Sequence, residues 1–208
     1  MKKLSLKTLI AVASLAASGV AFAQSANFSA SRTFEFDPDK TGGVVANWAK
    51  GVGEPDANAN NNFGLQLQKN VTTSTNASAG AVLDGLKGVT VLSGDTMGYD
   101  MTNGSPKQAG SPRFNVSWTL NGTSGFSFVG GSANATQTPA CQDPTHWTRF
   151  RMNLQDPTQA FPPVPVGAVL QSVVLIVDDQ GQYTLDNINF RDQIAGKPGS
   201  SSTSTGCP

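Results

Sequence analysis

Apolar residues recur at every second position along most of the chain after residue 33, which is the pattern of half-buried β-strands. The clearest run extends from Phe114 to Leu120, where apolar and polar residues alternate without interruption. The phase of this run places Trp118 in the core. Asn121-Gly122 follows directly, and this dipeptide favours a tight turn between antiparallel strands. Further strands are predicted at residues 34–36, 63–68, 82–86, 89–92, 126–128, 150–154, 169–177 and 183–190.

These runs predict an all-β fold, an antiparallel jelly-roll β-sandwich of about eight to ten strands. No segment with helical periodicity and caps follows the first 23 residues, so no substantial helix is expected. The composition, rich in Gly, Asn, Ser and Thr, suits short strands joined by turns. The run at 169–177 is almost continuously apolar, so we expect a central strand covered on both faces. A chain of 208 residues suits one domain.

The first 23 residues have the pattern of a secretory signal peptide. Lysines precede an apolar run from Leu9 to Val20, and Ala21-Phe22-Ala23 supplies the small residues that a signal peptidase recognises. The run is short for a bilayer core of about 30 Å, so we expect cleavage before Gln24 and no membrane-spanning segment afterwards. The predicted organisation is a signal peptide (1–23), a β-sandwich (24–193) and a disordered low-complexity tail (194–208). The mature protein is expected to be periplasmic or extracellular.

The charge balance and the cysteine content limit the partners and the compartment that the sequence supports. The chain has 14 basic and 14 acidic residues, and three of the lysines belong to the leader, so the mature protein is slightly acidic. This balance argues against a nucleic-acid partner. Cys141 and Cys207 are the two cysteines, and export to an oxidising compartment favours a disulfide between them. The alternative is that both cysteines are reactive thiols, but neither belongs to a Cys-x-x-Cys pattern.

No catalytic residues are predicted. His146 is the single histidine, and there is no Gly-x-Ser-x-Gly sequence to position a nucleophile. Asp178 and Asp179 are adjacent and precede Gly181, which favours a turn. Because neighbours on a strand point to opposite faces, they do not form a glycosidase pair by themselves. We therefore expect a protein that is not an enzyme.

Two short segments, one at each end of the predicted domain, resemble strands of a known family. Phe34-Glu35-Phe36-Asp37 near the start and the run from Tyr183 to Phe190 near the end resemble the first and last strands of jelly-roll carbohydrate-binding modules of the galactose-binding-like superfamily. The resemblance implies that these two strands are neighbours. It also implies a structural calcium ion held by Glu35 and Asp186, with Asp37 as a weaker ligand. Calcium prefers such oxygen ligands. The other interpretation is that these carboxylates face solvent at strand edges, and no further cofactor is predicted.

Aromatic residues are the candidates for sugar binding, because a pyranose ring presents an apolar C–H face. Trp48, Tyr99 and Trp147 are expected in loops, where their rings would be accessible. Arg149 and Arg151 share one polar strand face, which is either part of the ligand surface or an ordinary solvated face. The leading hypothesis is an exported, non-catalytic binding domain for a carbohydrate or a cell-surface polymer. The alternatives are a structural envelope or matrix protein without a small ligand, and a β-sandwich glycoside hydrolase or lyase.

Overall fold

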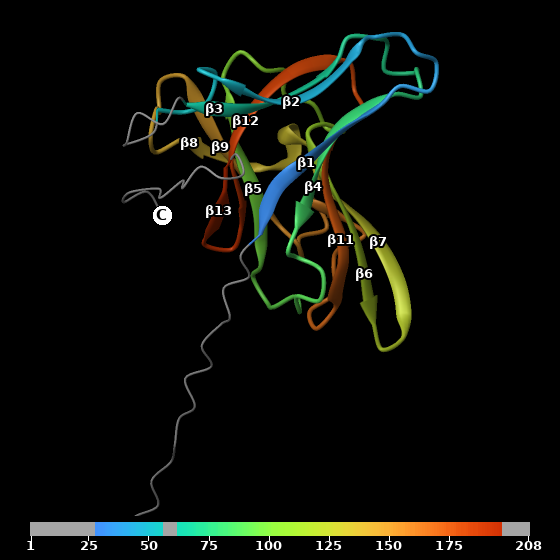
Figure 1. Cartoon of the computed structure of the whole chain (residues 1–208). Helices are drawn as coiled ribbons and strands as arrows, with labels where there is room; N and C mark the ends of the chain where they lie inside the picture. Colours follow the sequence, from blue (N-terminus) through green and yellow to red (C-terminus); the bar gives the residue numbers. More distant parts are fainter. Residues whose placement is uncertain (1–27, 56–61, 197–208) are drawn as a thin grey trace, which may run out of the picture.

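The fold is an antiparallel β-sandwich, as the alternating pattern predicts (Figure 1). It was obtained as a computed structural model, which describes residues 28–55 and 62–196. Sheet A consists, in spatial order, of β1 (Ser29–Phe36), β4 (Ser78–Asp84), β11 (Val169–Val177), β6 (Arg113–Leu120), β7 (Thr123–Gly130) and β10 (Ala160–Phe161). Sheet B consists of β2 (Val44–Lys50), β3 (Phe63–Lys69), β12 (Gly181–Phe190), β5 (Thr96–Thr102), β9 (Trp147–Asn153) and β8 (Thr136–Pro139), with β13 (Gln193–Ala195) beside β12. A single 3₁₀ turn spans Ser132–Asn134 within the described residues.

Eight of these strands have the connectivity of a jelly roll. Taken in chain order, they are β3, β4, β5, β6, β7, β9, β11 and β12. The first pairs with the last (β3 with β12) and the second with the seventh (β4 with β11), which gives the sheets β3-β12-β5-β9 and β4-β11-β6-β7. The predicted fold class is therefore confirmed, although shorter strands raise the count in the described residues to thirteen. β1 and β2 extend one edge of each sheet.

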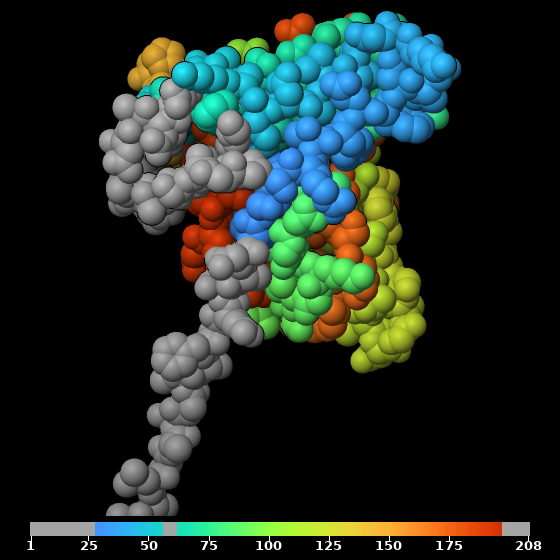
Figure 2. Space-filling model, viewed as in Figure 1, coloured from blue at the N-terminus to red at the C-terminus, as the bar shows by residue number. Residues whose placement is uncertain are grey.

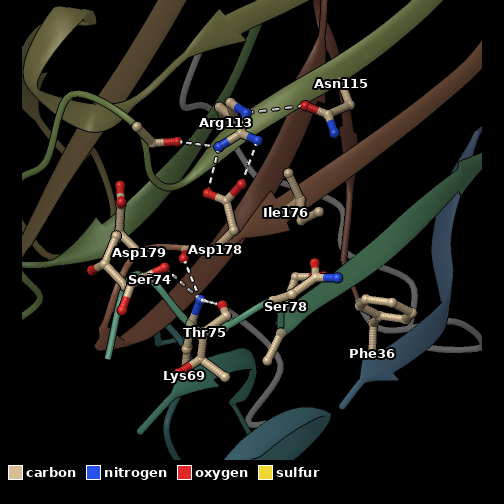
Figure 3. Close-up of a pocket in the computed structure, with 14 residues that line it drawn as sticks. Phe36, Lys69, Ser74, Thr75, Ser78, Arg113, Asn115, Ile176, Asp178 and Asp179 are labelled. Carbon is tan, nitrogen blue, oxygen red and sulfur yellow. Dashed lines mark hydrogen bonds and ion pairs between the residues drawn. The ribbon is translucent and has the colours of Figure 1, made fainter. Parts of the chain in front are cut away.

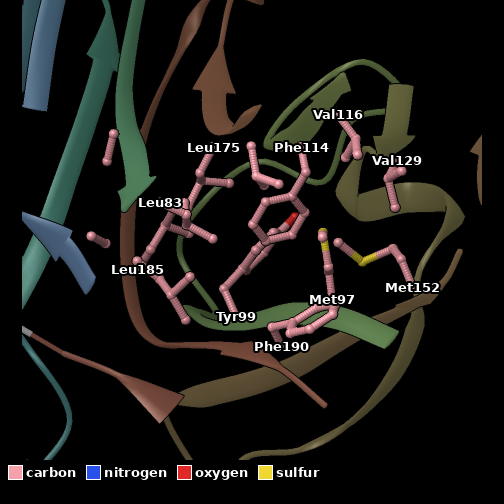
Figure 4. Packing of buried hydrophobic residues seen from close by; sticks show 14 of the residues in the cluster. Leu83, Met97, Tyr99, Phe114, Val116, Val129, Met152, Leu175, Leu185 and Phe190 are labelled. Atoms are coloured by element: carbon pink, nitrogen blue, oxygen red, sulfur yellow. The ribbon is translucent and has the colours of Figure 1, made fainter. Parts of the chain in front are cut away.

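The core lies between the two sheets and is filled by the inward-pointing residues of both (Figure 4). Phe114 and Val116 of β6 are fully buried, and Trp118 packs against the same cluster. The Trp118 Nε1 donates to Ser127 Oγ of β7 at 2.9 Å. The turn between β6 and β7 is made by Asn121 and Gly122, which both have positive φ, as an Asn-Gly hairpin turn requires.

The central strand β11 differs from expectation on one face. It lies between β4 and β6, as predicted for a central strand. However, Val174 and Ile176, which alternate with the fully buried Leu175, are only half-buried, and Ser172 is exposed. The prediction that both faces of this strand are covered is therefore wrong, and the outer face of sheet A is open.

The ends of the chain lie outside the described residues. The predicted signal peptide (1–23) falls there, as does the end of the predicted tail. Residues 194 and 195 belong to β13, where Ile194 pairs with Asn189 and Ala195 with Ile188. Within residues 28–55 and 62–196, the structure contains no helical segment that could cross a membrane.

Candidate functional site

The three aromatic residues expected in loops are packed in strands instead. Tyr99 of β5 is fully buried, stacks on Phe150 with ring centroids 5.5 Å apart, and donates its hydroxyl to Pro112 O at 2.8 Å. Trp147 begins β9 and is 5% exposed. Trp48 of β2 is half-buried, and its Nε1 donates to a carbonyl of β1 at 2.9 Å. The prediction that these rings form an accessible loop surface is wrong, because each ring lies against the protein itself.

The residues expected to share a calcium ion lie in different sheets. Glu35 belongs to β1 in sheet A, and its Oε1 accepts a hydrogen bond from Ala46 N of β2 at 3.0 Å. Asp186 belongs to β12, which lies two strands from β2 in sheet B, or about 10 Å. Asp37 accepts hydrogen bonds from Thr41 and Gly42 in the turn after β1. The implied pairing of the first and last strands is therefore wrong for β1, since β3 occupies that place beside β12.

Residues 28–55 and 62–196 contain no set of three or more His, Cys, Asp or Glu side chains arranged to hold a metal ion. Cys141 is disulfide-bonded, whereas Cys207 lies outside the described residues, so the predicted pairing of the two remains a prediction.

Arg149 and Arg151 lie on the outer face of sheet B and pair with a buried carboxylate. Asp100 of β5 is fully buried and accepts from Arg149 Nε at 3.1 Å and Arg149 Nη2 at 3.2 Å. Arg151 Nη1 lies 3.5 Å from Asp100 Oδ1. Burial lowers the pKa of Arg151 to about 10, although Asp100 opposes the shift. These arginines therefore belong to a covered ionic cluster.

The loop after β2 completes this cluster. Glu54 is fully buried, and its backbone N donates to Asp186 Oδ2 at 2.9 Å. Asn187, in a bulge of β12 with φ of 44°, donates to Glu54 Oε2 at 2.5 Å, to Asp100 Oδ2 at 3.1 Å and to Gln142 Oε1. Burial, with the charges of Asp100 and Asp186, raises the pKa of Glu54 to about 8. The cluster holds two loops against sheet B and does not form an open site.

The open face of sheet A is the stronger candidate for a functional site. Four phenylalanine side chains project from its strands into solvent, and they are Phe36 (47% exposed), Phe126 (42%), Phe128 (44%) and Phe161 (73%). Phe161 pairs with Phe128, which pairs with Asn115, so these three form a row across β10, β7 and β6. In Figure 2, β11 (orange) reaches the surface between β1 (blue) and β7 (yellow-green). Exposed apolar surface of this kind marks interaction sites in soluble proteins.

A cavity of about 660 Å³ opens on this face beside β11 (Figure 3). Its apolar walls include Phe36 and Ile176. Its polar lining includes Arg113, Asn115, Asp178 and Asp179, together with the segment of residues 73–78, which carries hydroxyl and amide side chains. Apolar walls with a few polar groups at fixed positions are typical of ligand sites.

Arg113, which lines this cavity, is held in place by four hydrogen bonds. Its guanidinium donates to Asp178 Oδ1 at 2.5 Å and Asp178 Oδ2 at 2.6 Å, to Gly110 O at 2.7 Å and to Asn115 Oδ1 at 3.0 Å. It also lies over the ring of Phe128, 5.0 Å from the centroid. Burial alone would raise the pKa of Asp178, but the hydrogen bonds and charge of Arg113 outweigh it and hold that pKa below its ordinary value.

A buried lysine fixes the wall of the cavity. Lys69 is 1% exposed, and its ammonium donates to Thr75 O at 2.5 Å, Asp178 O at 2.8 Å and Thr73 O at 3.1 Å. These bonds join the loop after β3 to the end of β11. Ser111 adds a second connection, since its Oγ accepts from the backbone N of Asp178 and Asp179 at 3.2 and 3.1 Å.

A second cavity, of about 310 Å³, lies on the other side of Arg113. It shares Gly110 and Arg113 with the first, and its walls include Phe128 and Phe161. We call the two cavities together the Arg113 groove. From Phe36 on β1 to Phe161 on β10 the groove crosses the six strands of sheet A, a width of about 24 Å.

No binding role is predicted from the sequence for Arg113 or for the phenylalanines of this groove, and Asp178 and Asp179 are interpreted there as turn residues. The period-two pattern places Arg113 and Asn115 on the outward face of β6, which is the signal that could have found them. In β7 the same pattern would turn Phe128 inward, whereas Phe128 is exposed and Ser127 is buried. Comparison of the chain with protein-family models, curated proteins and solved structures finds no match, so the resemblance to galactose-binding-like modules remains a prediction.

Proposed function

We propose that this protein is a non-catalytic binding domain for a carbohydrate chain, and that the Arg113 groove is its binding surface. The observation that carries the proposal is the set of exposed phenylalanine rings on one sheet face, next to fixed hydroxyl, amide and carboxylate groups. A sugar ring needs both, because its C–H face packs on an aromatic ring while its hydroxyls form hydrogen bonds. The predicted signal peptide would deliver the domain to a compartment where cell-surface polymers occur.

The shape of the groove favours a chain over a single sugar. Phe36 and Phe161 lie at opposite ends, with the two cavities between them. A width of about 24 Å accommodates several linked rings. We therefore expect affinity to rise with oligosaccharide length until both cavities are filled.

The state of the carboxylates favours binding over hydrolysis. A glycosidase needs one carboxyl group that keeps its proton and donates it to the leaving group. Asp178 is ionised and engaged with Arg113, and the pKa of its carboxyl group lies below the ordinary value. It is therefore poorly suited to act as the acid.

The alternative is a structural envelope or matrix protein, and the same exposed phenylalanines favour it, since a neighbouring protein could cover them. The two functions differ in a measurable way. A structural role predicts self-association that Phe128→Ala and Phe161→Ala weaken, whereas glycan binding predicts a monomer whose ligand protects the same rings.

The direct test is retention of the mature protein on a panel of polysaccharides, by affinity electrophoresis, followed by titration calorimetry. Phe36→Ala and Phe128→Ala should each weaken binding about tenfold, which corresponds to the loss of about 1.4 kcal/mol. Leu92→Ala is the matched control, because Leu92 is as exposed as Phe36 (47%) but does not line the groove. Circular dichroism checks that the variants fold. Lack of retention on every polysaccharide, or equal affinity for all four proteins, would exclude the proposal.

A further inference from the structure

The cationic groups of the Arg113 groove have almost no capacity left for a ligand. Each of the three Lys69 ammonium hydrogens has a carbonyl acceptor, and the residue is almost fully buried. The four hydrogen bonds of Arg113 use all but one of its N–H groups. An acidic group on a ligand would have to compete with Asp178 for this guanidinium.

Asp179, in contrast, keeps its hydrogen-bonding capacity for a ligand. It lines the larger cavity beside Asp178 (Figure 3), is half-buried, and its carboxylate makes no hydrogen bond or ion pair with the described residues. Gly110 provides the space next to it, because a Cβ atom built there would lie 2.4 Å from Asp179 Oδ2. The backbone N of Asp179 is held by Ser111 Oγ at 3.1 Å, which fixes the position of the residue.

Among the four charged side chains that line this cavity, Asp179 is therefore the one that keeps its capacity for a ligand, beside hydroxyl and amide groups that can donate or accept. A carboxylate with free lone pairs recognises O–H or N–H donors. A uronic acid, sulfate or phosphate group at the same place would meet a like charge with little compensation from Arg113 or Lys69. A neutral sugar hydroxyl or the ammonium group of an amino sugar would form a direct hydrogen bond.

We infer that the Arg113 groove selects glycans without acidic groups, and that Asp179 is the specificity-determining residue. This inference rests on the proposed function and adds the chemical class of the ligand. It follows from which charged groups in the cavity are already engaged and which one is not.

The test compares named polysaccharides of different charge. Neutral dextran, mannan, xylan and hydroxyethylcellulose, the amino polysaccharide chitosan, and acidic polygalacturonate and alginate are each tested with the mature protein at fixed ionic strength. We expect the acidic polymers to bind at least about tenfold more weakly than the best neutral or amino polymer. Asp179→Asn should reduce this difference to less than about threefold.

The matched control is Asp192→Asn, which removes the same charge at an exposed position between β12 and β13, outside the groove. It should leave the discrimination unchanged, so that an effect of net charge is distinguished from an effect of Asp179. The comparison within the wild-type protein decides whether the groove discriminates against acidic glycans even if Asp179→Asn fails to fold.

The outcomes distinguish failure of the proposed function from failure of the inference about Asp179 alone. If no polysaccharide in the panel binds, both fail. If neutral and acidic polymers bind equally well to the wild-type protein, or acidic ones bind better, the proposed function stands and the inference about Asp179 is refuted. The same follows if folded Asp179→Asn discriminates as strongly as Asp192→Asn.

Discussion

Replacement of Glu54 by glutamine is expected to make the protein more stable in mildly alkaline solution. Glu54 is fully buried with Oε1 lacking any hydrogen-bond partner, while Oε2 accepts from Asn187. The carboxylates of Asp100 and Asp186 surround it, and both raise its pKa. Glutamine has nearly the same shape and keeps an oxygen for Asn187, but it cannot ionise.

The magnitude follows from linkage between protonation and folding. The pKa of Glu54 rises from an ordinary 4.5 to about 8 in the folded protein. Between these values the unfolded chain loses a proton that the folded chain keeps, so unfolding becomes more favourable as the pH rises. At about 1.4 kcal/mol per pH unit, the shift sets an upper limit of about 5 kcal/mol on the stability lost between pH 4.5 and pH 8. Glu54→Gln removes this loss.

The assay is urea unfolding of the mature protein, followed by tryptophan fluorescence, at pH 5, 6, 7 and 8. The two proteins should be similar near pH 5, and Glu54→Gln should be more stable by several kcal/mol at pH 8. Asp100→Asn serves as a comparison, since it removes a fully buried carboxylate that pairs with Arg149 and Arg151, and it should lower the free energy of unfolding by about 3 kcal/mol at pH 8. A difference between wild type and Glu54→Gln that stays constant with pH would refute the reasoning.

Three further predictions concern residues that shape sheet A. Lys69→Met leaves three backbone carbonyls without their donor and should lower the free energy of unfolding by about 3 kcal/mol, measured with urea. Unchanged stability would contradict the inference that Lys69 holds the loop after β3 against the end of β11. Gly125→Ala places a Cβ 2.2 Å from the Trp118 ring, so the ring must move, and the tryptophan emission should shift; an unaltered spectrum would count against this packing. Gly80→Ala places a Cβ 2.5 Å from the Phe34 ring and should lower the thermal midpoint through a loss of about 1 to 3 kcal/mol, which an equal or higher midpoint would disprove.

Alternation along the chain predicted most of the strands and, in β6, the side chains that face the core, but not in β7, where Phe126 and Phe128 are exposed and Ser127 is buried. The run from Phe114 to Leu120 became β6 with its apolar residues inside, and the Asn121-Gly122 turn formed where predicted. Tyr99 shows the limit of this approach. It alternates with Gly98 and Asp100 in the same way, but the glycine and the charge made the segment resemble a loop, and only the partner Pro112 O explains how its hydroxyl is buried.

The candidate site depended on long-range pairing that local sequence does not encode. Arg113 meets Asp178 because β6 pairs with β11, across 65 residues of chain, and Lys69 reaches Asp178 across 109. The sequence by itself determined an all-β fold, because side chains in a strand alternate between two faces whatever the partner strand is. Only the tertiary structure decided which outer face stays open and which charges are neutralised there. Those properties depend on strand order and register, which arise from contacts between distant segments.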